Sequence, residues 1–148
     1  MSLAEKFCIT AAFIFFLIGL FAGIWKYLLM VKSENGKSRY YVDAAHSTSF
    51  LYSVSALLLS VFARYSLFPA VVNEVSALSA LIFFGSAIAL NVITGIKSDT
   101  RNQIKESKNG TPGFSPMWLV NSYMFLLIIG EVGGSAILGT GALLAIWS

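Results

Sequence analysis

Charge is scarce in this sequence. Only 11% of its 148 residues are charged, whereas soluble domains carry about 25%. Hydrophobic residues make up 57%, and the mean hydropathy is +0.77. A soluble core cannot hide four separate apolar runs of membrane-spanning length, so this composition excludes a cytosolic enzyme or a nucleic-acid binder. The net charge of +3 is of the kind that orients short loops at a membrane, and it needs no nucleic-acid partner to explain it.

Cysteine and histidine are each present once. The single cysteine, Cys8, allows no intrachain disulfide and no CxxC pair, which excludes thiol-disulfide chemistry, and we expect it to be a small apolar residue of the first helix. The sequence also lacks a Ser-His-Asp set, a carboxylate pair, a phosphate-binding loop and a zinc motif. Candidate chemistry therefore falls on the only histidine, His46, and on a few polar residues within the apolar runs.

Four apolar runs are each near or above the ~20 residues needed to cross a membrane. They predict helices over residues 7–30, 44–63, 75–96 and 118–147. The polar connections are expected at residues 31–43, 65–69 and 97–116, the last rich in glycine and proline. The sequence thus predicts an all-α fold, an integral membrane four-helix bundle that forms a single transmembrane domain over residues 1–148.

The basic residues are distributed unevenly over the connections. Only Lys6 and Arg64 lie on one side, and the other eight gather around the first and third loops: Lys26, Lys32, Lys37, Arg39, Lys97, Arg101, Lys105 and Lys108. By the positive-inside rule, these two loops are cytoplasmic and both termini are on the non-cytoplasmic side. We therefore expect a multi-pass protein of the cell inner membrane.

Two GxxxG motifs, Gly19 to Gly23 and Gly130 to Gly134, allow close approach of helix backbones. They either close the bundle within one chain or form an interface between subunits.

Polar side chains at membrane depth are candidates for function, because they are costly there. His46 shares a helix face with Ser49 and Ser53. If the helices alternate in direction, Asn91 and Asn121 lie in the same layer as His46. A lone interfacial histidine is either a hydrogen-bonding or headgroup-contacting residue or a metal ligand, since neutral imidazole is the commonest such ligand.

Glu131 falls about 20 Å along the fourth helix from Pro116, close to mid-membrane. It is either a neutral carboxyl bonded to a serine or a backbone carbonyl, or a proton-relay or ligand-binding group. Tyr52 and Tyr123 are either packing aromatics with paired hydroxyls or pocket residues.

Several short motifs together resemble the styrene oxide isomerases, which are small four-helix bacterial membrane enzymes with haem b. They are Gly23-Ile24-Trp25, Ala45-His46-Ser47, Asn91-Val92, the Gly/Pro-rich loop before the fourth helix, and the run Leu138 to Leu143. The resemblance implies that His46 is the axial ligand of haem b iron, with Ser47 and Ser49 beside the cofactor. It also implies a homo-oligomer, specifically a trimer.

The implied reaction rearranges a small apolar or aryl epoxide to an aldehyde without net electron transfer, with ferric iron as the Lewis acid. We expect Tyr52, Asn91 and Tyr123 to line the substrate pocket on the free face of the iron. The sequence departs from the family at two positions. Tyr52 stands where the family has an asparagine, and Thr94 and Gly95 stand where it has a substrate-side tyrosine.

Two other functions compete with the isomerase. A non-catalytic haem- or quinone-binding anchor subunit of a membrane redox complex would also need four helices and a histidine. A lipid-modifying or glutathione-dependent trimer would need arginines inside the bundle, and the predicted helices contain none.

Overall fold

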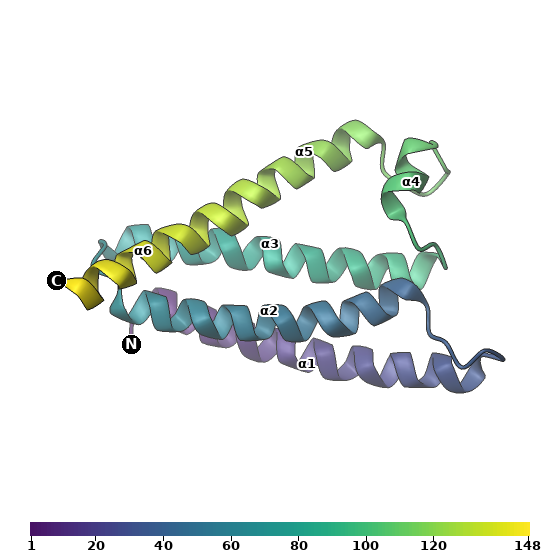
Figure 1. Ribbon diagram of the computed structural model, residues 1–148, viewed down its shortest axis with the longest axis horizontal. Coiled ribbons are helices and arrows are strands. Elements are labelled where there is room, and N and C mark those ends of the chain that lie inside the picture. The colour runs from purple at the N-terminus through teal and green to yellow at the C-terminus, as the bar shows by residue number, and fades with distance from the viewer.

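The computed structural model describes residues 1–148 as helices joined by short connections (Figure 1). The elements are α1 (Leu3–Lys32), α2 (Tyr40–Tyr65), α3 (Ala70–Lys97), α4 (Gln103–Lys108), α5 (Met117–Leu127), the π-helix η1 (Ile128–Gly133) and α6 (Gly134–Trp147). Four helical stretches are long and apolar enough to cross a membrane: α1, α2, α3 and the continuous stretch Met117–Trp147 formed by α5, η1 and α6. This confirms the all-α fold with four helices long and apolar enough to span a membrane.

The helices extend a few residues beyond the apolar runs. Helix α2 already begins at Tyr40, so Asp43 is helical rather than part of the first loop, where it was expected. There its carboxylate forms an ion pair with Lys26 of α1. Two elements were not predicted: the short helix α4 inside the third polar segment, and the π-helical turn in the middle of the fourth span.

Helices α1 and α2 pack through small side chains. The buried residues of α1 recur every three or four positions and are Ala4, Cys8, Ala12, Phe15, Gly19 and Ala22. The buried residues of α2 are also mostly small and are Val42, Ala45, Ser49, Ser53, Ala56, Leu59, Ser60 and Ala63. Small residues allow two backbones to approach closely where lipid supplies no hydrophobic driving force. Buried Cys8 has the packing role expected for it.

The glycines of both GxxxG motifs contact other helices of the same chain. A Cβ on Gly19 would lie 3.2 Å from the Phe50 ring, and one on Gly23 would lie 2.8 Å from Cε1 of His46, both on α2. In the fourth span, Gly130 packs against the Phe83 ring and Gly134 against the backbone carbonyl of Ser76, both on α3. The glycines therefore close the bundle within one chain.

The helix ends are tied to one another by polar contacts. At one end of the bundle, Nη1 of Arg39 donates to the carbonyl oxygens of Gly95 and Ile96 at 3.0 and 3.2 Å, which satisfies carbonyls in the last turn of α3. At the other end, Oγ of Ser66 donates to Oδ1 of Asn73 at 2.8 Å, and Nδ2 of Asn73 donates to the carbonyl of Phe68 at 3.0 Å. These bonds hold the predicted short turn between α2 and α3.

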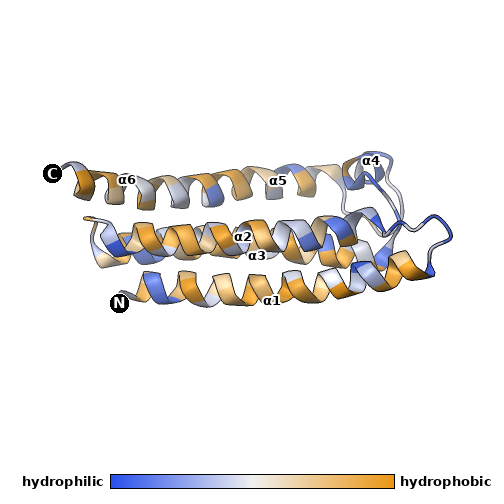
Figure 2. Cartoon of the chain, turned by 60° about the horizontal axis from the view of Figure 1, so that its bottom comes forward, coloured by the Kyte–Doolittle hydropathy of each residue, from blue (hydrophilic) through white to orange (hydrophobic).

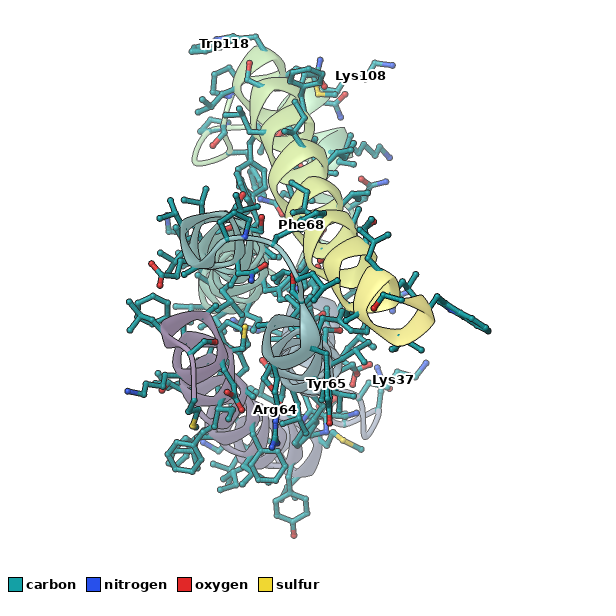
Figure 3. The ribbon with its side chains drawn as sticks, turned by 90° about the vertical axis from the view of Figure 1, so that its left-hand side faces the viewer. Lys37, Arg64, Tyr65, Phe68, Lys108 and Trp118 are labelled. Carbon is teal, nitrogen blue, oxygen red and sulfur yellow. The ribbon has the colours of Figure 1, made fainter.

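The fourth span crosses the other three helices obliquely (Figures 1 and 3). Its second half, α6, packs on α2 and α3 and buries Gly134, Leu138, Gly141 and Ala142. Its first half, α5, has no buried residue and diverges from α3 toward α4. The divergence begins near η1, where the helix is π-helical.

Polar residues gather at one end of the molecule. Figure 2 shows hydrophobic colour along the spans and hydrophilic colour at the end that holds the α1–α2 connection and α4. Both termini lie together at the opposite end (Figure 1). The two loops that were predicted to share a membrane side therefore do lie at one end of the bundle.

Candidate functional site

His46 lies in the second turn of α2 and faces the glycine-rich groove of α1. Its Nδ1 lies 2.8 Å from the carbonyl oxygen of Gly19. A carbonyl oxygen accepts only, so Nδ1 carries a proton, and in the neutral imidazole the lone pair is on Nε2. Gly23 leaves the space that the ring occupies, and Phe50 packs against the ring edge with centroids 5.0 Å apart. The imidazole is half-buried and its tautomer is set by the backbone of α1.

The two serines expected beside the cofactor have different surroundings. Ser49 is fully buried, and its Oγ donates to the carbonyl of Ala45 at 2.7 Å. Ser53, one turn further, donates to the carbonyl of Ala12 in α1 at 2.8 Å. Ser47 is exposed. Ser49 thus has a packing role between α1 and α2, and Ser47 is the accessible one of the two predicted cofactor-binding serines.

Tyr52 lies on a different face of α2 from His46. Its ring stacks on Phe84 of α3 with centroids 4.4 Å apart and 19° between planes. Its hydroxyl faces the carboxyl of Glu131 in η1. Oε2 of Glu131 is buried and has no hydrogen-bond partner. A tyrosine and a carboxyl, both expected at membrane depth, thus meet where the fourth span is π-helical, a conformation that is rare and frequent at functional sites.

Asn91 and Tyr123 lie on the same side of α2 as Tyr52. Nδ2 of Asn91 donates to Oγ1 of Thr48 at 3.3 Å, and Thr48 lies one helical turn before Tyr52. The hydroxyl oxygen of Tyr123 lies 2.7 Å from Oγ of Ser86, and Tyr123 is within electrostatic range of Tyr52. The structure therefore brings Tyr52, Asn91 and Tyr123 to the region between α2, α3 and the fourth span.

Within one chain, His46 lies outside that region, and the pocket expected on the free face of an iron held by His46 stays a prediction. Tyr52 lies six positions after His46, and at ~100° per residue their side chains leave α2 about 120° apart. His46 contacts α1, whereas Tyr52 contacts α3 and η1. Asn121, expected in the same layer, is exposed on α5.

A cavity of about 590 Å³ lies between α3, α4 and α5. Nine of its twelve lining residues are hydrophobic, and Tyr123 and Ser86 form part of its wall. The sequence does not predict this cavity, because the cavity depends on α4 and on the divergence of α5. Neither feature has a hydrophobic-periodicity signal, and only the glycine-rich stretch around Glu131 marks the fourth span as irregular.

No three or more His, Cys, Asp or Glu side chains come together in a way that could hold a metal ion. Comparisons with models of known protein families, with curated proteins and with solved structures find no match for this chain.

Proposed function

We propose that this chain is a haem b-dependent membrane isomerase of the styrene oxide isomerase type, with His46 as the axial ligand. The observation that supports this most is the hydrogen bond from Nδ1–H of His46 to the carbonyl of Gly19. Metal-ligating histidines almost always donate their second ring N–H to a carbonyl, carboxylate or water, which fixes the tautomer and raises the basicity of the ligating nitrogen. His46 has this arrangement, with Nε2 left as the donor to iron.

The surroundings of His46 also suit an apolar macrocycle. Phe50 packs on the imidazole edge, and Phe16 packs edge-on against Phe50 with centroids 5.5 Å apart. Phe16 is 45% exposed, so the aromatic surface beside the histidine is open. Because no part of the same chain covers this face, the homo-oligomer that the resemblance implies, a trimer, would supply its cover.

When bound, ferric haem supplies a Lewis acid for the oxygen of an epoxide. His46, oriented by its hydrogen bond to the Gly19 carbonyl, would hold that group. Tyr52 and Asn91 would provide a hydroxyl and an amide to position a small apolar substrate, with Tyr123 beside them. The spans would exclude water, so opening of the benzylic C–O bond and a 1,2-hydride shift would give the aldehyde instead of a diol. No electrons are gained or lost overall.

The same proposal includes an orientation in the membrane. The α1–α2 connection and the segment with α4 face the cytoplasm of a bacterial inner membrane, and both termini face the other side. The eight basic residues near these two segments support this orientation.

The decisive experiment for the cofactor compares absorption spectra of purified His46→Ala, Glu131→Gln and unsubstituted protein. We expect a Soret band with a high-spin ferric pattern in the unsubstituted protein and its loss in His46→Ala, because no other histidine can replace the ligand. Glu131→Gln should retain the band, since Glu131 faces Tyr52 rather than His46. A full, unshifted band in His46→Ala contradicts the assignment, and loss of the band in Glu131→Gln moves the site to η1.

Gas chromatography of the haem-loaded protein with styrene oxide tests the reaction. We expect the aldehyde from ferric protein, less from reduced protein, and less from Tyr52→Phe at unchanged haem content. Haem-loaded protein that forms no aldehyde above a haem-only control, and that copurifies with a soluble redox partner, would identify an anchor subunit instead.

A further inference from the structure

The apolar cavity between α3, α4 and α5 has no role in the proposed isomerase. It measures about 590 Å³, within the range of ordinary ligand sites. Leu90 and Ile93 of α3 form one wall, and Leu119, Tyr123 and Met124 of α5 form the other. Ile93, Leu119 and Met124 are each about 45% exposed, so the cavity opens sideways on the surface of the spans, where lipid is the solvent.

Two polar groups in the wall formed by α3 and α5, Ser86 and Tyr123, are paired with each other. Oγ of Ser86 donates to the carbonyl of Phe83 at 2.9 Å, so the hydroxyl of Tyr123 donates to Ser86 at 2.7 Å. The inner part of the cavity therefore presents apolar surface and offers no free hydrogen-bond donor from this pair. An apolar chain fits it better than a polar small molecule does.

The end of the cavity at α4 includes polar groups, and two lysines follow the lining residues of α4 in the sequence. The backbone N–H of Gln103 donates to the hydroxyl of Tyr41 at 2.9 Å, which anchors the start of α4 to α2. Gln103 and Ile104 line the cavity, and Lys105 and Lys108 follow on the same helix and are exposed. In Figure 3, Lys108 and Trp118 both lie at the outer end of the diverging span.

The one carboxylate on α4 is engaged with neutral partners. Glu106 accepts hydrogen bonds from Thr100 at 3.3 Å and from Thr111 at 2.7 Å. It makes no ion pair with either lysine of α4, because the only ion pair in the structure joins Lys26 and Asp43. The lysines of α4 are therefore free to meet an anion from outside the chain.

We propose that this cavity is a binding site for an anionic phospholipid, with one acyl chain between α3 and α5 and the phosphate against Lys105 and Lys108. Basic pockets between spans on the cytoplasmic side are suited to acidic headgroups. A helix of a second copy fits less well, because a helix about 10 Å wide occupies roughly 400 Å³ per turn, so the cavity holds little more than one turn.

The test reconstitutes the full chain in phosphatidylcholine vesicles that contain a small fraction of phosphatidylglycerol with a photoreactive diazirine in its acyl chain. Vesicles with the same photoreactive chain on phosphatidylcholine are the headgroup control. After illumination, mass spectrometry locates the labelled peptides. We expect labels concentrated on the segments around Leu90 and Tyr123, and more from phosphatidylglycerol than from phosphatidylcholine.

Two pairs of variants separate the acyl-chain and headgroup contributions. Ala89→Phe narrows the cavity and should reduce labelling there several-fold, whereas Ala136→Phe, at an exposed alanine of α6, should not. Replacing Lys105 and Lys108 by glutamine should reduce the preference for phosphatidylglycerol by roughly fivefold per lysine, whereas Lys6→Gln at the opposite end should leave it unchanged.

Labelling spread evenly over all exposed spans, or equal labelling by the two lipids, would overturn the proposal. Disulfide-linked dimers formed by Ala89→Cys in the membrane would also overturn it, because they would place a second copy in the cavity. The native cysteine does not interfere, since Cys8 is fully buried.

Discussion

At the scale of single residues, one glycine determines where the candidate ligand can sit. Gly23 has only a hydrogen where a Cβ would lie 2.8 Å from Cε1 and 3.0 Å from Nδ1 of His46. Real Cβ atoms do not come this close, so any larger residue must displace the imidazole. Displacement would break the bond to Gly19, which is the contact that fixes the tautomer of the ring.

Gly23→Ala is therefore expected to weaken haem binding although it changes no ligand. Loss of an outer hydrogen-bond partner of a ligating histidine costs about 10–100-fold in metal affinity. Titration of the haem-free protein with haem, followed at the Soret band, measures this. Gly133→Ala is the matched control, because a Cβ there meets nothing within 4 Å. Equal affinities of the two variants would show that the groove of α1 does not position His46.

At the scale of helices, the contacts of the fourth span with α3 depend on backbone proximity. A Cβ on Gly134 would collide with the carbonyl of Ser76, which as backbone cannot move aside, whereas a Cβ on Gly139 would meet the Phe62 ring at 3.7 Å, an ordinary contact. The two glycines lie on the same helix, α6, and only one of them is required by sterics.

We expect Gly134→Ala to destabilise the protein by about 1–3 kcal/mol, as overpacking generally does. Gly139→Ala should be neutral or slightly stabilising, because alanine is the better helix former. Thermal unfolding in detergent, followed by circular dichroism, compares the two. A similar loss of stability in both variants would mean that any added side chain on α6 destabilises the protein, and that the collision with Ser76 is not the specific cause.

The sequence predicts the four spans well because long apolar runs follow directly from the thickness of a membrane. It does not predict α4, which is only six residues long, or η1, which begins inside an apolar run that looks uniformly α-helical. Helix spacing places His46 on one face with Ser49 and Ser53. It does not show that His46 packs on the glycines of α1 while Tyr52 packs on α3, because those contacts depend on how the helices pack.

At the scale of the whole molecule, the even number of spans places both termini at one end, and the basic connections lie at the other. Reporter fusions test the proposed orientation. A reporter at Lys37 or Lys105 that is active only in the cytoplasm should be active, and one at either terminus should be silent. Active reporters at the C-terminus would invert the orientation and move the layer of His46 to the opposite membrane face.

The π-helical turn η1 is the place where the fourth span can lose a residue without a change in helix register. A π turn closes with i→i+5 bonds and holds one residue more than an α turn, so the flanking helices keep their register if that residue is removed.

Deleting Val132 in η1 should therefore leave α5 and α6 in place and change the melting temperature little. Deleting Leu126 in α5 should rotate the residues before it by about 100° and take Tyr123 away from Ser86. Val132 is 61% exposed and Leu126 is 55% exposed, so neither deletion removes a buried side chain. A lower melting temperature for the Leu126 deletion alone would therefore result from the changed helix register. The fourth span would then tolerate a change in length at only one turn, the turn that contains Glu131.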